Sequence, residues 1–381
     1  MNIIIFSPTN EGTIAKCSAS LFEALKNNEK CNVKLLTLYK YAEGEQIFAD
    51  CEYLIDRMVD ETANCSYWKK IKWLRSQKRK FNAHLTVSTL NATSLLNVLS
   101  FGNGKTIGIF HAPKVQAKAF GKIHYFLTIL AYYFIFPFLD KCFCVSQESK
   151  QDLESVSTIK RNKIEVVYNI YNIDRIKSLS TDNLDNTYAE IFSNPVVLYC
   201  GRLDENKAPI RAIDALSYVK DKSLHLVIIG PDPYNIWEDI KCRIPADIKN
   251  RIHYLGPQKN PYKFISRSRI LVSCSYSEGL PGVIIEALAL KVPVVATNSS
   301  QGIWEILSCY QYYDLSLSSM SMFDDGIITS NLSYRNKEKY ETDIINLSAA
   351  IDILLVRSLP LSFRFAKEIN SESVITKYIN I

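Results

Sequence analysis

The chain lacks the signatures of several large classes of nucleotide-binding protein. No strand-like segment is followed by a Gly-X-Gly-X-X-Gly turn, which argues against a dinucleotide-dependent oxidoreductase. A P-loop is absent as well, because the Gly-Lys-Thr sequence within Gly102–Thr106 precedes a strand-like segment rather than a helix. No Asp-X-Asp triplet follows a strand-like segment, and clustered carboxylates are what a divalent cation normally requires. We therefore expect no bound cofactor and no metal.

The chain also has little net charge and no closely spaced cysteine motif. A net charge of +6 over 381 residues is mild and does not predict nucleic-acid binding. The ten cysteines form no Cys-X-X-Cys pair and no metal-type spacing. Met1–Phe6 is too short and too uncharged at its start to be a signal peptide, so we expect a cytoplasmic protein. Several cysteines lie in apolar runs, where cysteine behaves as a small hydrophobe: Cys142, Cys144, Cys200 and Cys274.

Two segments are candidates for contact with a membrane surface. The longest uncharged run, Ile123–Leu139, is rich in aromatic residues but slightly short of a spanning helix, and it contains Pro137. It predicts a buried or interfacial helix. Tyr67–Asn82 interleaves seven cations with apolar residues and has no acid, as in a basic amphipathic helix on anionic lipid. An ordinary solvated face with apolar residues packed inward is the alternative. Peripheral contact with the inner face of the plasma membrane is thus one expectation.

Apolar strand-like segments alternate with helical ones along the whole chain. Continuous Val, Ile and Leu runs separated by helices are typical of parallel sheets covered on both faces. The predicted fold class is therefore α/β, with two doubly wound, Rossmann-like domains and a cleft between them. The expected strands are Asn2–Phe6, Asn32–Leu38, His84–Thr89, Lys105–Phe110, Lys141–Ser146, Lys163–Tyr168, Val196–Cys200, Leu224–Gly230, Arg251–Gly256, Arg269–Ser275 and Val292–Thr297.

The domain boundary is expected in a polar, turn-rich stretch, Ser180–Tyr188. The predicted domains are residues 1–180 and 181–362. Residues 363–381 look helical and are expected to pack back on the N-terminal domain. The stretch from 308 to 340 is poorly periodic, and its structure stays open.

The segment Glu278–Glu286 places two carboxylates on either side of a helix start. Pro281 suits a first helical turn, and Leu280, the expected N-cap, has no side-chain oxygen to accept a hydrogen bond. The first amides of that helix are then available to an anion such as phosphate: those of Gly282, Val283 and Ile284. The two carboxylates would accept hydrogen bonds from hydroxyls flanking that phosphate, as in a nucleotide-sugar. A capped helix with a solvated Glu286 explains the motif equally well.

Other polar residues also follow predicted strands. In open parallel sheets, ligands bind beyond the carboxyl ends of the strands, and Gly12, His111, Arg202 and Glu278 all lie there. Arg202 and Lys207 are five residues apart at a strand-to-helix corner, from which both cations can reach one diphosphate. An interdomain salt bridge is the alternative. His111 is either structural or in contact with a reacting sugar.

The ordered motifs resemble those of a known family. They are Gly201–Leu203 with Lys207, Leu226–Gly230, Leu255–Gly256, Glu278–Pro281 with Glu286, and Pro293–Thr297. This series resembles the retaining glycosyltransferase family 4 (glycosyl transferases group 1), which has the GT-B fold. The resemblance is strong from Val196 to Leu307 and looser in the first half. Thr297–Leu307 looks most like bacterial enzymes that build surface polysaccharides.

The resemblance implies a metal-independent, retaining hexosyltransferase. It would move a hexose or N-acetylhexosamine from a nucleotide-sugar, expected to be UDP-linked, to a glycolipid or oligosaccharide acceptor. Arg202 and Lys207 would bind the donor diphosphate, Glu278 the hydroxyls of the sugar, and Glu286 those of the ribose. Residues 1–180 would bind the acceptor and residues 181–362 the donor.

Further residues take roles from the same resemblance. Gly12 would let the first loop approach the donor, and His111 would contact the sugar near its reacting carbon. Gly256 would lie beside the base. The backbone that would cradle phosphate belongs to Leu280, Pro281, Gly282 and Val283.

The chain departs from the family pattern at two turns. Ala208 stands where glycine is common, and Gly230–Pro233 replaces the usual glycine-acid-glycine-proline turn. Two rivals stay open. One is a sugar-nucleotide epimerase or glycan phosphorylase on the same fold, and the other is a non-catalytic GT-B partner protein.

Overall fold

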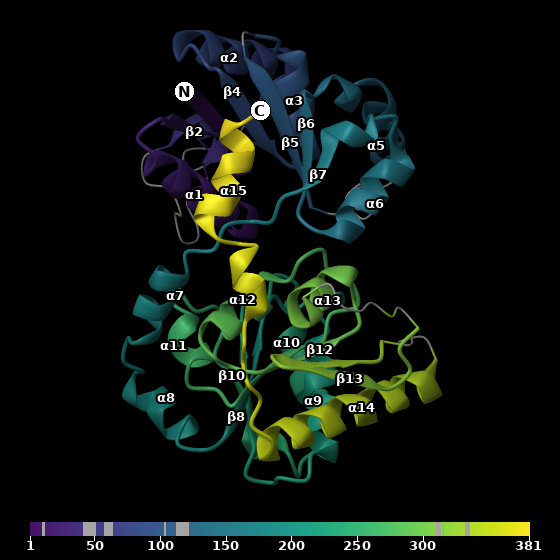
Figure 1. Ribbon diagram of the computed structural model, residues 1–381. Helices are drawn as coiled ribbons and strands as arrows, with labels where there is room; N and C mark the ends of the chain where they lie inside the picture. The colour runs from purple at the N-terminus through teal and green to yellow at the C-terminus, as the bar shows by residue number, and fades with distance from the viewer. Residues whose placement is uncertain are drawn as a thin grey trace. The chain divides into compact units, whose positions relative to one another are not determined.

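The chain divides into two compact units, each built around its own sheet. The computed structural model describes residues 1–9, 12–40, 51–56, 64–102, 104–111, 122–309, 314, 316–331 and 336–381. Unit 1 comprises Met1–Asn172 and Lys367–Ile381, and unit 2 comprises Ile173–Ala366 (Figure 1). Among the described residues each unit has one seven-stranded sheet, so the predicted α/β class is confirmed.

Unit 1 has a fully parallel sheet in the order β3-β2-β1-β4-β5-β6-β7. Its central strands are continuous apolar runs because helices cover both faces, and Ile3 to Phe6 of β1 are fully buried. The sequence missed one strand of this sheet, the short edge strand β3. The strands are β1 (Asn2–Thr9), β2 (Asn32–Lys40), β3 (Glu52–Asp56), β4 (Leu85–Thr89), β5 (Lys105–Phe110), β6 (Lys141–Cys144) and β7 (Ile164–Val166).

The C-terminal tail belongs to unit 1. Its helix α15 lies beside α1 (Figure 1). Tyr378 packs edge-on against Phe143 of β6 with ring centroids 5.0 Å apart, and Lys377 pairs with Glu165 at 3.1 Å. The helices of unit 1 are α1 (Gly12–Lys26), α2 (Tyr67–Lys80), α3 (Asn91–Leu99), α5 (Lys122–Phe134), α6 (Gln147–Val156) and α15 (Ser371–Ile379), with 3₁₀ turns η1 (Phe136–Phe138) and η2 (Arg161–Lys163).

Unit 2 has the sheet order β10-β9-β8-β11-β12-β14-β13, in which only β13 is antiparallel to its described neighbour. The β13–β14 hairpin lies in the stretch that the sequence left open. β13 is a half-buried edge strand of four residues, so it carries little hydrophobic signal. The strands are β8 (Val196–Cys200), β9 (His225–Ile229), β10 (Ile252–Tyr254), β11 (Ile270–Ser273), β12 (Val294–Thr297), β13 (Met320–Phe323) and β14 (Gly326–Thr329).

Two helices, α9 and α14, lie side by side against the sheet of unit 2 (Figure 1). They bury residues such as Ile213, Leu216 and Leu347 in the main core of the unit. The helices are α7 (Ile173–Ser180), α8 (Asn186–Ile191), α9 (Pro209–Tyr218), α10 (Ile236–Arg243), α11 (Tyr262–Ile265), α12 (Gly282–Ala289), α13 (Gln301–Ser308) and α14 (Lys337–Val356), with 3₁₀ turns η3 (Lys249–Arg251) and η4 (Arg364–Lys367).

The boundary between the units differs from the predicted one at residue 180. It falls after Asn172, because α7 packs against α11 and α12 and so belongs to unit 2. The polar stretch that suggested a linker is itself attached to unit 2, since Asn260 Nδ2 donates to Leu179 O at 2.7 Å and to Asp182 Oδ2 at 2.8 Å. The return to unit 1 comes at Lys367 rather than at 363.

Beyond its first turn, helix α2 packs apolar residues inward, as the alternative interpretation of this segment expected. Ile71 and Leu74 are buried in a core cluster with Phe6 of β1. Lys78 is also buried, and its Nζ donates to Asn97 O at 2.8 Å. Burial, with repulsion from Arg75, lowers the pKa of Lys78 from 10.5 to about 7.

This buried lysine makes the stability of unit 1 depend on pH. Between pH 7 and 10.5 the unfolded chain binds more protons than the folded one, so stability rises as the pH rises through this window. Replacing Lys78 by Met removes the ionisable group, and we expect Lys78→Met to be more stable than the parent at pH 6 by about 1–3 kcal/mol. The difference should shrink towards pH 10. Urea unfolding across this range measures it, with the exposed Lys80→Met as the matched control. A gain that does not change with pH would contradict the assignment.

Candidate active site

Two loops at the carboxyl ends of neighbouring strands form the candidate site of unit 2. β8 pairs with β11, so the loop after β8 (residues 201–208, the first loop) and the loop after β11 (residues 274–281, the second loop) lie side by side. Backbone and side-chain bonds join them: Asn206 Nδ2 donates to Ser277 O at 2.9 Å, and Tyr276 N donates to Asn206 O at 2.8 Å. The two loops therefore form one connected surface.

The first loop is shaped by a buried carboxylate and a tyrosine. Asp204 Oδ1 accepts from the Lys207 amide at 2.7 Å, and its Oδ2 lies 3.1 Å from Arg202 Nη2. Tyr199 on β8 donates its hydroxyl to Arg202 O at 2.9 Å. These contacts fix the backbone at both cations. The Arg202 side chain is still 60% exposed and available to a ligand. The chain continues through Ala208, whose φ of +47° is a left-handed conformation that favours glycine.

Lys207 and Glu278 meet where the two loops join. Lys207 Nζ forms an ion pair with Glu278 Oε1, and the same oxygen accepts from Ser275 Oγ at 2.6 Å. Both side chains are largely buried. The second oxygen, Oε2, has no hydrogen bond within the described part of the chain and so can accept from a ligand. Both residues belong to unit 2, so this ion pair of Lys207 is not an interdomain salt bridge.

Helix α12 begins beside this pair without a side-chain cap. Its N-cap is Pro281, one residue later than the predicted Leu280, because Pro281 keeps an extended ψ of 103° and the helix starts at Gly282. The first turn contains no acidic residue, so the amides of Gly282 and Val283 lie in a favourable place for an anion. Glu286, the fifth residue of α12, accepts a hydrogen bond at its Oε1 from Tyr262 OH at 3.2 Å.

Two glycines bring neighbouring loops into close contact with the site. Gly230 has φ +144°, and a Cβ there would lie 1.9 Å from Gly201 O, so only glycine fits. Its amide donates to Gly256 O at 3.0 Å, which places Gly256 beside the first loop. A Cβ on Gly302 would lie 2.1 Å from Gly279 O, so the start of α13 packs directly on the second loop.

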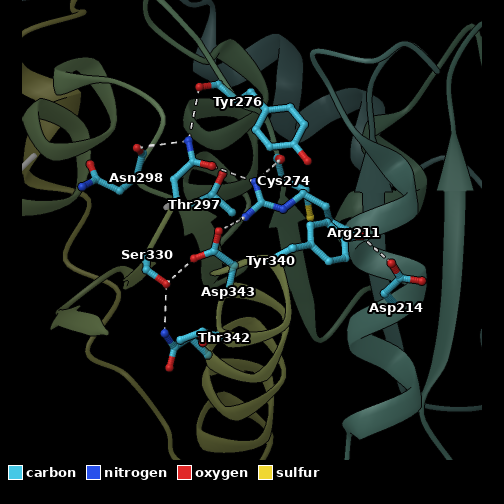
Figure 2. A network of polar contacts seen from close by, with 12 residues as sticks. Arg211, Asp214, Cys274, Tyr276, Thr297, Asn298, Ser330, Tyr340, Thr342 and Asp343 are labelled. Carbon is cyan, nitrogen blue, oxygen red and sulfur yellow. Dashed lines mark hydrogen bonds and ion pairs between the residues drawn. The ribbon is translucent and has the colours of Figure 1, made fainter. Parts of the chain in front are cut away.

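A buried arginine contacts the second loop from the core of unit 2. Arg211 of α9 is fully buried and pairs with Asp343 of α14 at 3.3 Å (Figure 2). Its guanidinium donates to Cys274 O at 3.3 Å and to Asn331 Oδ1 at 2.8 Å, and it lies 4.8 Å from the Tyr276 ring centroid. The role of this cation is not apparent from the sequence, because its partner Asp343 is 132 residues away.

The same polar network extends to both sides of Arg211 (Figure 2). Ser330 Oγ donates to Asp343 Oδ1 at 2.7 Å, and Thr297 Oγ1 donates to Ser275 O at 2.7 Å. Tyr340 of α14 donates its hydroxyl to Asp214 of α9. Burial, together with the Asp214 carboxylate, raises the pKa of Tyr340, so the hydroxyl stays protonated and keeps donating. The second loop is thus tied to α9, α14 and β12.

Two predicted site residues lie in unit 1. Gly12 is the first residue of α1, after β1, and His111 follows β5. His111 lines a small pocket with Thr89, Tyr168 and Asn169, and its carbonyl accepts from Ser149 Oγ at 2.5 Å. Burial lowers the pKa of His111 to about 4, so the imidazole is neutral at neutral pH.

Neither a metal site nor a spanning helix is found within the described ranges. No group of three or more His, Cys, Asp or Glu side chains there could hold a metal ion. No helix there is both long and apolar enough to cross a bilayer. Three of the four cysteines in apolar runs are buried as expected, namely Cys142 and Cys144 of β6 and Cys274 directly after β11. Cys200, at the end of β8, is only half-buried.

The Arg211–Asp343 pair should behave as a unit. Arg211→Met or Asp343→Leu alone leaves one buried charge without its partner, and we expect each to lower the free energy of unfolding by about 3–5 kcal/mol. The double variant should lose less than the sum of the two, because it leaves neither charge buried alone. Urea unfolding of the full chain and of the three variants measures this. Strictly additive losses would show that the pair is not coupled.

Comparison with known proteins relates part of this chain to a known family. The model of the family "Glycosyl transferases group 1" matches residues 194–310, which contain both loops of the candidate site. An uncharacterized glycosyltransferase of Methanocaldococcus jannaschii is 35% identical over 185 residues, which cover 48% of this chain and 45% of the relative. The chain thus spans about half the length of that curated relative.

Two further similarities extend over more of the chain. The Campylobacter jejuni GalNAc-α-(1→4)-GalNAc-α-(1→3)-diNAcBac-PP-undecaprenol α-1,4-N-acetyl-D-galactosaminyltransferase is 24% identical over 311 residues, 80% of each chain. The crystal structure of HepE from Anabaena in complex with UDP-glucose has a TM-score of 0.67 at 15% identity and covers 100% of both chains, which shows a shared fold. Residues 194–310 of this chain are therefore similar to the group 1 glycosyl transferases, and the chain has the GT-B fold of its structural neighbours.

Proposed function

We propose that this chain is a metal-independent, retaining hexosyltransferase. It moves a hexose or N-acetylhexosamine from a UDP-linked donor to a lipid-linked or polysaccharide acceptor during synthesis of a bacterial surface glycan. The observation that carries the proposal is the cluster of Lys207, Glu278 and Ser275 beside the uncapped start of α12. The Lys207 ammonium and the first amides of α12 suit a diphosphate, and the Glu278 carboxylate suits the hydroxyls of a sugar attached to it.

The diphosphate would bind to Arg202, Lys207 and the first amides of α12. Lys207 Nζ gives one bond to Glu278 and has two further protons for phosphate oxygens. Arg202 adds a planar fork at the exposed rim of the first loop. Fixed positive groups of this kind stabilise the charge that develops on the leaving diphosphate, and they need no metal.

The hydroxyls on either side of the diphosphate would bind to the two glutamates. Lys207 and Ser275 both hold Glu278 Oε1, which leaves Oε2 for the hydroxyls of the transferred sugar. Tyr262 orients Glu286 in the same way for the ribose. Gly256, at the turn next to Gly230, would lie beside the base.

The chemistry needs a good leaving group more than a protein nucleophile. As the bond between the anomeric carbon and the diphosphate breaks, a leaving phosphate oxygen assists deprotonation of the incoming hydroxyl on the same face, which retains the configuration. His111 would contact the sugar as a neutral imidazole, since its lowered pKa keeps it uncharged above pH 5. Gly12, at the start of α1, would allow the first strand-to-helix loop of unit 1 to approach the donor.

The relatives support the choice of donor and acceptor. HepE binds UDP and UDP-glucose in its crystal structures. The Campylobacter jejuni enzyme acts on an acceptor linked through a diphosphate to undecaprenol. Other relatives take part in lipopolysaccharide core and capsular polysaccharide synthesis. We assign donor binding to unit 2 and acceptor binding to unit 1.

Two variants separate the diphosphate role from the sugar role. We expect Lys207→Ala to weaken binding of UDP itself by about 10- to 100-fold, since it removes a charge-assisted hydrogen bond. We expect Glu278→Gln to leave UDP affinity within a few-fold but to lower sugar transfer by about 100-fold or more. Calorimetric titration of UDP and a transfer assay with a panel of UDP-sugars measure the two effects.

The controls are substitutions of the same kinds on exposed positions of unit 2, Lys220→Ala and Glu238→Gln. Both should bind UDP and transfer sugar like the parent. Undiminished UDP binding by Lys207→Ala, or unchanged transfer by Glu278→Gln, would refute the proposed roles.

A further inference from the structure

Helix α5 of unit 1 exposes a continuous apolar face. Apart from Tyr125, its exposed large side chains recur at positions i, i+1, i+4, i+7 and i+8, which lie on one side of a helix. Phe126 and Phe134 of this helix are 62% and 69% exposed. Phe138, in the following 3₁₀ turn, is 74% exposed. We call this surface the α5 patch, and it consists of Phe126, Leu127, Leu130, Tyr133, Phe134 and Phe138.

The α5 patch is not needed for the core of unit 1. The opposite side supplies the buried contacts, since Tyr132 of α5 and Phe136 of the following 3₁₀ turn pack against Phe110 with ring centroids 6.1 and 5.5 Å apart. α5 is therefore apolar on both sides although only one side is covered. Contiguous exposed apolar surface of this kind on a folded unit marks a binding surface.

A positively charged segment borders the α5 patch. The segment Ser155–Ile164 contains three cations and no acid, and Lys160 and Arg161 are exposed. Two hydrogen bonds place this segment next to the end of α5: Lys163 Nζ donates to Pro137 O at 2.9 Å and to Leu139 O at 2.8 Å. The segment and the α5 patch therefore form one surface.

Two more contacts complete the border of the patch. Thr158 Oγ1 donates to Tyr133 O at 2.7 Å, which attaches the basic segment to α5 itself. Of the nearby carboxylates, Asp140 accepts from the Thr106 amide at 2.8 Å and from the Thr106 hydroxyl at 3.0 Å, and Asp152 and Glu154 lie on α6. Lys160 and Arg161 form no ion pair with any of them in the described part of the chain, so both are available to anionic groups that meet the patch.

The basic helix α2 lacks this combination. Its Ile71 and Leu74 point into the core, and Lys70 and Lys78 are buried and hydrogen-bonded within unit 1. Only the first turn exposes large rings, Trp68 among them at 74%. Of the two segments that the sequence marked for membrane contact, α5 is the one with an uncovered apolar face.

We propose that the α5 patch and its basic border dock unit 1 on the surface of an anionic bilayer. The aromatic and leucine side chains enter the interfacial layer, while Lys160 and Arg161 contact lipid phosphates. α5 has 13 residues, so it lies in the interface and does not span. Aromatic rings bordered by cations suit this boundary better than a protein surface of mixed charge. The inference extends the proposed function, because a lipid-linked acceptor is presented at that surface, but membrane binding is measured without catalysis.

Co-sedimentation of the full chain with vesicles tests the proposal. The vesicles contain either phosphatidylcholine alone or phosphatidylcholine with phosphatidylglycerol. We expect the parent to bind the anionic vesicles preferentially and Phe134→Ser/Phe138→Ser to bind them at least about tenfold more weakly. Lys160→Glu/Arg161→Glu should lose the preference for anionic lipid. Trp68→Ser removes an aromatic ring that is equally exposed outside the patch and should bind like the parent.

Three results would overturn the proposal. One is vesicle binding that the Phe134/Phe138 variant retains in full, and another is binding that Trp68→Ser abolishes instead. The third is a parent dimer that the Phe134/Phe138 variant converts to a monomer, which would make the patch a contact between copies. UDP titration of each variant is the control: unchanged UDP affinity shows that the fold and the donor site persist. A chain that binds vesicles but not UDP would contradict only the proposed function.

Discussion

The buried Arg211–Asp343 pair is the contact on which the candidate site depends most. It joins α9 to α14 in the core of unit 2, and the guanidinium also holds the carbonyl of Cys274 and the ring of Tyr276. The second loop continues from there to Glu278. A fully buried arginine therefore supports the loop that carries the largely buried Glu278. This arrangement keeps the charged ligand-binding groups on the surface of a rigid support, which lowers the entropy that binding must overcome.

The sequence carried enough information for the fold and for part of the site. Apolar runs such as Ile3–Phe6 predicted parallel strands because buried strands are apolar on both faces. Arg202, Lys207 and Glu278 were assigned from their positions after strands, and pairing of β8 with β11 brings the last two into contact. Their proximity follows because strand ends in a parallel sheet share one edge, while their roles toward a ligand stay predictions.

What the sequence could not provide depends on distant contacts. Arg211 and Asp343 each look like an ordinary surface residue on a helix, and only the packing of α9 on α14 buries them. The boundary at Asn172 was missed for a similar reason, since α7 belongs to unit 2 through its contacts with α11 and α12. The helix starts at Gly282 rather than at Pro281 because Pro281 keeps an extended ψ angle, which the sequence does not determine. For α5, the sequence showed apolar character but not which side of the helix is covered.

The central claim is that unit 2 binds a nucleoside diphosphate at the junction of its two loops. A crystal structure of the full chain with UDP tests it most directly. The account predicts a phosphate oxygen of UDP within hydrogen-bonding distance of Lys207 Nζ and near the first amides of α12, with a ribose hydroxyl on Glu286. A nucleotide bound elsewhere, or a Lys207–Glu278 pair that stays remote from the phosphates, would contradict it.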